Sequence, residues 1–218
     1  KSAKTIRQFT LQIGEFLKNN DVKMIVIACN TVSSTALELL RETYPDIPIV
    51  GCITPTAKEV VKICDKDSRI GIMATKATVK SGVYEDKIKS LNEELFIESI
   101  ACPALVPLIE EGIIDNEIMD LTLKYYLDDF IKENDINTLI LGCTHYPLIS
   151  KNLKRLYPNI KIFSSSKEVA TAVKMELEAA DMLSQNENAK SIFYASDLSE
   201  NFVNMIERIL GRDSDELN

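Results

Sequence analysis

This chain of 218 residues has a single histidine, His145, and no tryptophan. Its five cysteines include no CxxC pair, and with one histidine the chain lacks the usual ligands of a structural zinc site. An odd number of cysteines without close pairs also argues against a disulfide framework and favours a reducing compartment, so we expect a cytoplasmic protein. No apolar run approaches the roughly 20 residues that cross a bilayer, and we therefore expect no membrane partner.

An excess of positive charge is lacking as well. The chain has 25 Lys and Arg against 33 Asp and Glu, which gives a formal net charge of −8. This balance argues against nucleic acid as the main partner. A small anionic substrate stays possible, because the charge of a binding site is local.

Apolar, strand-like runs alternate with helical patterns along the whole chain. Strands are predicted at 24–27, 69–73, 138–141 and 192–195, and the predicted helices include 148–157, 169–183 and a closing helix at 202–210. This alternation predicts an α/β fold in which the sheets are mostly parallel.

One segment occurs twice. Residues 18–29 recur as residues 132–143, 114 positions later, with lysine, asparagine, aspartate and cysteine in matching places and an aliphatic run between them. Each copy predicts a helix end, a turn, a buried strand and then a cysteine, Cys29 or Cys143. The repeat indicates two pseudo-symmetric α/β halves of similar design.

The two cysteines are placed where ligands bind in such folds. Ligands of parallel α/β sheets sit beyond the carboxyl ends of the strands, and Cys29 and Cys143 each follow a predicted strand. Two halves facing each other would aim both thiols into one cleft from opposite sides. Polar residues follow both cysteines: Asn30 and Thr31 in the first copy, Thr144 and His145 in the second.

Two opposed thiols suit a racemisation, in which one group removes an α-proton and another returns a proton to the opposite face. A thiol has a pKa of about 8.5 unless its surroundings shift it, so it can act as acid or as base. His145 is close enough in sequence to assist Cys143, whereas Cys29 has no equal partner. Taken singly, each cysteine could instead be a buried residue at a strand end, followed by a helix cap.

Two further stretches are candidates for the site. Thr75 and Thr78 follow a predicted strand and could offer hydroxyl and backbone N–H groups to a carboxylate, although plain helix capping is the alternative. Glu110 follows an apolar turn and is either part of the site or a solvated acid. The remaining cysteines, which lie on apolar patterns and are expected to serve packing, are Cys52, Cys64 and Cys102.

These motifs resemble those of the glutamate racemases, within the aspartate/glutamate racemase family. The resemblance covers essentially the whole chain, and the two cysteine motifs in this order and at this separation are specific. The segments that carry it are 27–31, 74–78 with Ser81 and Tyr84, 101–110 and 141–148.

The resemblance implies roles for the candidate residues. Cys29 and Cys143 would be the two acid/base residues, and Glu110 and His145 would support the chemistry. The family uses neither pyridoxal phosphate nor a metal, makes D-glutamate for peptidoglycan and usually forms dimers, so it implies glutamate as substrate, no cofactor and a homodimer. The residues that would bind the amino acid are Asn30, Thr31, Thr75, Thr78 and Thr144.

The resemblance also implies a domain division and shows one departure. It suggests a first domain of residues 1–52 plus 164–218, with residues 53–163 forming a second domain. The Asp-Ser-Gly and Pro-Tyr-Gly motifs near the start of the family's members do not occur here. We therefore expect an edge of the first domain to precede Lys1 in the family's pattern, and we expect residues 1–218 alone to racemise glutamate poorly.

Other functions compete with this interpretation. An aspartate-type racemase has a similar fold and related cysteine motifs, although His145 followed by Tyr146 and Pro147 favours the glutamate enzymes. A thiol hydrolase or transferase would use Cys143 with His145 and leave Cys29 dispensable. A non-catalytic binding module would be favoured if the departure at the start is natural.

Overall fold

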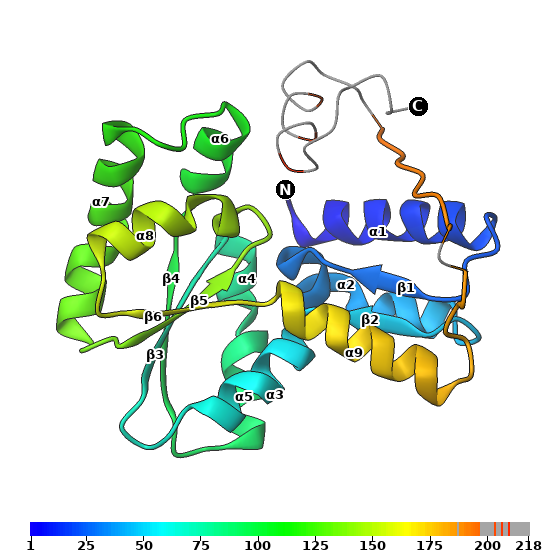
Figure 1. Ribbon diagram of the computed structural model, residues 1–218, viewed down its shortest axis with the longest axis horizontal. Helices are drawn as coiled ribbons and strands as arrows, with labels where there is room; N and C mark the ends of the chain where they lie inside the picture. Colours follow the sequence, from blue (N-terminus) through cyan, green and yellow to red (C-terminus); the bar gives the residue numbers. More distant parts are fainter. Residues whose placement is uncertain (187, 197–202, 204–205, 207–208, 210–218) are drawn as a thin grey trace.

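The computed structural model describes residues 1–186, 188–196, 203, 206 and 209. Within these residues the strands form two sheets, one of two strands and one of four, and helices surround both (Figure 1). Every strand pairing is parallel. The predicted α/β fold with parallel sheets is confirmed.

The smaller sheet consists of β1 (Ile25–Ile27) and β2 (Ile49–Gly51). Helices α1 (Ala3–Lys18) and α2 (Asn30–Thr43) pack against each other beside it. Their close approach depends on Gly14, because a Cβ at that position would lie 2.7 Å from atoms of the Leu40 and Tyr44 side chains. Ile25 and Ile27 point into this core, while Val26 between them stays 43% exposed.

The larger sheet has the strand order β4-β3-β5-β6. Both inner strands are buried: β5 along its whole length and β3 beyond its first residue. Their sequences are apolar at successive positions because both faces of the sheet are covered. The bounds are β3 (Arg69–Ala74), β4 (Phe96–Ala101), β5 (Thr138–Gly142) and β6 (Lys161–Ser164).

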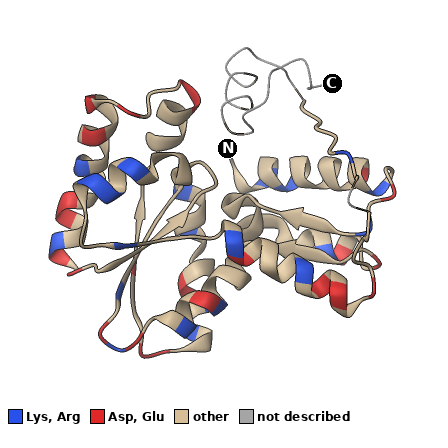
Figure 2. Ribbon diagram, in the orientation of Figure 1, with Lys and Arg blue, Asp and Glu red and all other residues tan. Residues whose placement is uncertain are grey.

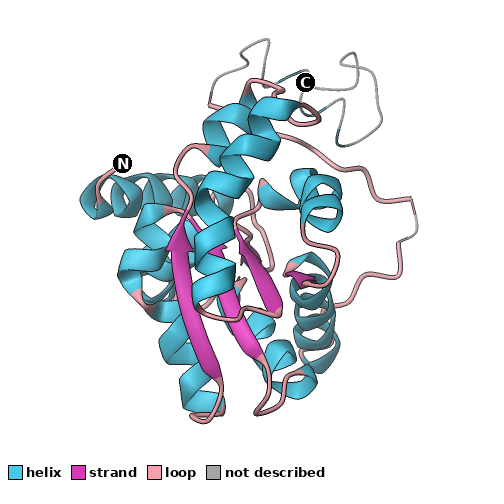
Figure 3. Cartoon of the chain, turned by 90° about the vertical axis from the view of Figure 1, so that its left-hand side faces the viewer, coloured by secondary structure: helices cyan, strands magenta, loops and turns pink. Residues whose placement is uncertain are grey.

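Helices lie on both faces of the larger sheet (Figure 3). Met73, Leu139 and Leu141 belong to the core on one face, whereas Ile72 and Ile140 belong to the core on the other. Most charged residues lie on the outer helices and loops (Figure 2). The first face is covered by α6 (Leu105–Glu110), α7 (Glu117–Glu133) and α8 (Ser150–Leu156), and the second by α3 (Ile53–Ile63), α5 (Val83–Leu91) and α9 (Ser166–Ala179).

The repeated sequence segment makes the same left-handed turn in both copies. Asp21 and Asp135, which occupy matching positions, have φ angles of 52° and 49°. Aspartate tolerates this left-handed region better than most residues, and it reverses the chain between a helix end and a strand. In each copy the chain then enters β1 or β5 and reaches the cysteine one or two residues after the strand.

Some predicted elements differ from those observed. Residues 192–195 do not form a strand, because no strand among the described residues pairs with them, and an isolated extended segment gains no ladder hydrogen bonds. The helix predicted at 169–183 ends at Ala179. The helix predicted at 148–157 begins as a 3₁₀ turn, η1 (Tyr146–Ile149). The predicted closing helix at 202–210 falls largely outside the described residues.

Within the part that the structure describes, the chain passes from the smaller sheet to the larger one after β2. The domain boundaries near 52 and 164 stay a prediction, with α3 packing on the core of the larger sheet. Among the described residues, no helix is both long and apolar enough to cross a membrane.

Candidate active site

Cys29 and Cys143 lie beyond the carboxyl ends of β1 and β5, one in each sheet. Cys29 occupies the N-cap position of α2 and is exposed, whereas Cys143 is only 7% exposed. The two thiols are close enough for negative charge on Cys29 to raise the pKa of Cys143. The two predicted acid/base residues therefore follow strands of different sheets and interact electrostatically.

The surroundings of Cys143 keep its thiol protonated. Burial is the main cause that raises its pKa to about 11. Hydrogen bonds from the backbone N–H groups of His145 and Tyr146 act in the opposite direction. Charge on Cys29 and on Glu110 raises the pKa further. At neutral pH Cys143 is thus a proton donor, and it needs help to act as a base.

His145 connects Cys143 to a carboxylate. Its Nδ1 lies 3.8 Å from Sγ of Cys143, and its Nε2 lies 3.2 Å from Oε1 of Glu110, at the end of α6. The Glu110 side chain is 52% exposed, so water screens its charge and its contribution to stability is small. This geometry orients the imidazole ring toward the thiol.

Three threonine hydroxyls meet between the two sheets. Oγ1 of Thr31, at the start of α2, lies 2.8 Å from Oγ1 of Thr75 and 3.2 Å from Oγ1 of Thr78. Thr75 is the N-cap of α4 (Lys76–Ser81), and its hydroxyl lies 3.1 Å from that of Thr78. Plain helix capping accounts for Thr75 alone, but it does not explain why a hydroxyl from another helix joins the pair.

Asn30 is 2% exposed and directly follows Cys29. Its Oδ1 accepts a hydrogen bond of 2.7 Å from the Tyr84 hydroxyl, while its Nδ2 is buried without a partner. Buried donors are nearly always satisfied in proteins, and each exception needs an explanation. A donor of this kind beside a thiol is suited to an acceptor on a bound ligand.

The other predicted residues have less distinctive surroundings. Thr144 is exposed and directly follows Cys143. The three cysteines that were assigned to packing are all buried, with raised pKa values caused mainly by desolvation: Cys52, Cys64 and Cys102. No group of three or more His, Cys, Asp or Glu side chains suited to a metal occurs in the described part of the chain.

Sequence reasoning missed two polar contacts of the site. Tyr84 was noted only as part of a motif, and nothing in the sequence indicates that its hydroxyl meets Asn30, 54 positions away. Ser33 Oγ donates to the backbone oxygen of Ile27 and accepts from the backbone N–H of Cys52, which ties β1 to the segment that leads from β2 to the larger sheet. Its position one helical turn after Asn30 was the only available signal.

Comparisons with known proteins place the chain in a family. The sequence profile of the Asp/Glu/Hydantoin racemase family matches residues 1–173. The glutamate racemase of Persephonella marina is 39% identical over 213 residues, covering 98% of this chain and 79% of that protein. The glutamate racemase of Sulfurihydrogenibium sp. is 48% identical over 175 residues, covering 80% of this chain and 66% of that protein.

Solved structures show the same likeness. The crystal structure of glutamate racemase from Francisella tularensis in complex with D-glutamate superposes with a TM-score of 0.90 at 31% identity, covering 98% of this chain and 79% of that one. The chain therefore belongs to the Asp/Glu/Hydantoin racemase family. Within that family it has the sequence and the fold of a glutamate racemase, an isomerase.

Proposed function

We propose that the protein interconverts L-glutamate and D-glutamate without a cofactor, with Cys29 and Cys143 as the two acid/base groups. The observation that carries the proposal is the placement of the two thiols beyond the carboxyl ends of strands in different sheets, with His145 held between Cys143 and Glu110. A reaction that inverts one carbon needs acid/base groups on two opposite faces of the substrate.

The proton balance of the reaction is simple. The thiolate of one cysteine takes the α-proton and becomes a thiol, while the electron pair of the broken C–H bond stays on the substrate. The thiol of the other cysteine then donates its proton to the opposite face and becomes a thiolate. The raised pKa of Cys143 suits the donating role. When this thiol must give up its proton, the support comes from His145, and Glu110 acts by orienting the imidazole ring, because its own charge raises the pKa of the thiol.

The proposed binding groups lie around the thiols. The hydroxyls of Thr31, Thr75 and Thr78 and the free Nδ2 of Asn30 are donors for the carboxylates of an amino acid. The N-terminus of α2, which carries Asn30 and Thr31, favours negative charge through its unpaired backbone N–H groups. Thr144 is the proposed binding residue beside Cys143.

The biological setting follows from the family. We propose that the product D-glutamate supplies peptidoglycan synthesis in the cytoplasm, and that the enzyme acts as a homodimer of two-domain subunits. Residues 1–52 with 164–218 are the proposed first domain and residues 53–163 the second.

The test compares cysteine variants of the full-length enzyme, with racemisation followed by circular dichroism and α-proton exchange followed in D₂O. We expect Cys29→Ser and Cys143→Ser each to abolish racemisation, because an alcohol is a far weaker acid than a thiol. Each variant should still exchange the α-proton of one enantiomer, since one thiol remains. Cys64→Ser, which changes a buried cysteine of the larger core, is the control and should keep its activity.

Two results would contradict the proposal. Normal racemisation by Cys29→Ser would refute the two-thiol mechanism, and a covalent acyl intermediate on Cys143 would point to a thiol hydrolase. A preference for aspartate over glutamate in the unmodified enzyme would assign the chain to the aspartate-type racemases instead.

A further inference from the structure

Tyr84 contacts the proposed site from the larger sheet. It lies on α5, belongs to the core of the larger sheet and is 1% exposed. Its hydroxyl donates to Oδ1 of Asn30, which begins α2 beside the smaller sheet. This single hydrogen bond therefore joins the two parts of the fold directly next to Cys29.

The bond determines what Asn30 presents to the site. An amide has an acceptor at Oδ1 and a donor at Nδ2, and rotation of the group by half a turn exchanges them. When the Tyr84 hydroxyl engages Oδ1, the amide leaves Nδ2 as the free group, and Nδ2 is indeed buried without a partner. An amide turned the other way would present an acceptor, which would repel a carboxylate.

We propose that Tyr84 is a positioning residue for substrate binding, which holds the Asn30 amide so that its Nδ2 donates to a carboxylate oxygen of the bound amino acid. The inference rests on the proposed function, because Asn30 is a binding residue there. Tyr84 itself does not touch the substrate in this account.

A purely structural role is the competing explanation. The ring of Tyr84 packs in the same core as Ile53, Ala57 and Ile88, and this packing would be unchanged by phenylalanine. The positioning role belongs to the hydroxyl, which also interacts with the buried Thr56 side chain of α3. Removal of this oxygen atom together with changes at Asn30 therefore separates the two explanations.

The experiment is Tyr84→Phe in the full-length enzyme, with kcat and KM measured for both enantiomers of glutamate. The net contribution of one hydrogen bond corresponds to roughly a threefold to tenfold effect. We expect KM to rise by about this factor while kcat changes less than about twofold, because the bond acts on binding. An unchanged KM, or a fall in kcat at constant KM, would overturn the inference.

Tyr157→Phe is the matched control. Tyr157 also donates a phenol hydrogen bond of 2.7 Å, but to Asp128 on α7, away from Asn30. Removal of this hydroxyl should leave KM for glutamate unchanged. A KM increase equal to that of Tyr84→Phe would show that loss of any such bond has this effect, and the inference would fail.

A double-mutant cycle tests whether Tyr84 acts through Asn30. Asn30→Ala alone should raise KM, and adding Tyr84→Phe should then raise KM no further. Multiplied effects would overturn the positioning role but leave the binding role of Asn30 intact. A normal KM in Asn30→Ala would overturn both, whereas the two-thiol mechanism is tested separately by the cysteine variants.

Asn30→Asp keeps the inference open to refutation if Tyr84→Phe does not fold. The aspartate keeps an oxygen to accept from Tyr84 and replaces the free Nδ2 by a second oxygen. We expect a KM increase of more than tenfold, because the variant sets a negative oxygen against the substrate carboxylate. An unchanged KM in this variant would refute the inference.

Discussion

Nε2 of His145 lies 3.2 Å from Oε1 of Glu110, on the opposite side of the ring from the nitrogen that faces Cys143. The contact fixes the ring so that Nδ1 stays 3.8 Å from the thiol. Removal of the Glu110 charge should therefore weaken the support that His145 gives to Cys143, without removing the thiol itself.

We expect Glu110→Gln to lower kcat for racemisation by roughly twofold to fivefold, the effect expected of a partly exposed contact that involves a charged carboxylate. The glutamine keeps the size and the acceptor oxygen but not the charge. The free energy of unfolding should change by less than about 0.5 kcal/mol, because substitutions at exposed positions rarely do more. Steady-state kinetics and urea unfolding provide the two measurements.

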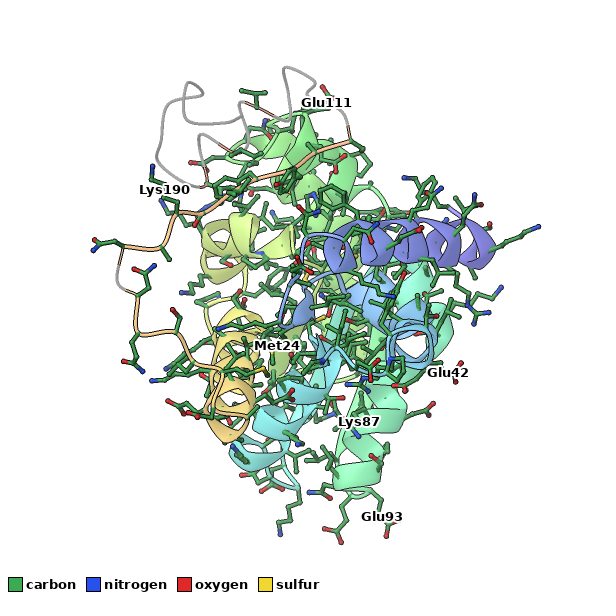
Figure 4. All side chains as sticks on the ribbon, turned by 90° about the vertical axis from the view of Figure 1, so that its right-hand side faces the viewer. Met24, Glu42, Lys87, Glu93, Glu111 and Lys190 are labelled. Atoms are coloured by element: carbon green, nitrogen blue, oxygen red, sulfur yellow. The ribbon has the colours of Figure 1, made fainter. Side chains whose placement is uncertain are left out.

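Glu111→Gln is the control for this prediction. Glu111 is exposed and lies at the periphery of the molecule (Figure 4). The substitution removes the same charge one residue further along the chain. Equal losses of kcat in the two variants would show that net charge, and not the contact with His145, is responsible.

The two proposed bases should differ in their reactivity toward iodoacetamide. The thiolate is the reacting form, and the pKa of Cys143 is raised to about 11, mainly by burial. Below this pKa the thiolate fraction of Cys143 grows about tenfold with each pH unit. In the substrate-free enzyme we therefore expect the exposed Cys29 to be alkylated before Cys143, and the labelling rate of Cys143 to rise steeply from pH 7 to pH 10.

Mass spectrometry of the labelled peptides at several pH values gives this measurement. Cys102 is the internal control, since its pKa is raised to about 12 and it is fully buried. It should react more slowly than Cys143 throughout. Labelling of Cys143 that is as fast as that of Cys29 at pH 8, or that does not depend on pH, would contradict the protonated state assigned to this thiol.

The sequence did not predict this difference between the two thiols. The repeat of residues 18–29 at 132–143 predicted the turn, the strand and the cysteine in both copies, because these follow from local propensity and a local apolar run. It did not predict that Cys29 is exposed and Cys143 buried. Exposure depends instead on what lies beside each strand, and β5 lies between two strands whereas β1 pairs only with β2 in the described structure.

For the same reason, the sequence did not predict the contacts between segments that belong to the two sheets. The threonines at 75 and 78 were predicted as a pair, but the third hydroxyl, from Thr31, arrives from another helix. The bond between Tyr84 and Asn30 joins segments with no shared periodicity. The wrongly predicted strand at 192–195 shows the converse, since an apolar run forms a strand only where a partner strand is available.

Activity should survive exhaustive treatment with EDTA and should not depend on added pyridoxal phosphate. Two thiols can perform both proton transfers, and no step of the proposed mechanism requires an electron sink. The measurement is the racemisation rate before and after dialysis against the chelator. A loss of activity that added metal restores would refute a cofactor-independent mechanism.

The final prediction concerns Gly142, the residue before Cys143. A Cβ at this position would lie 2.9 Å from Cβ of Ala74 and 3.0 Å from the backbone oxygen of Met73, in the neighbouring strand β3. A backbone atom in a paired strand cannot move aside as a flexible side chain can. The matching residue of the first copy is Ala28, which is exposed and has room for its methyl group.

We expect Gly142→Ala to lower the free energy of unfolding by about 1–3 kcal/mol, as overpacking does in buried cores. The displaced strand should carry Cys143 with it, so kcat per folded molecule should fall as well. Gly71→Ala is the matched control, because its Cβ would meet side chains of Phe130 and Ile136 at the other end of the sheet. It should lose stability but keep kcat. A Gly142→Ala enzyme with normal kcat would show that the position of Cys143 does not depend on the close contact between β3 and β5.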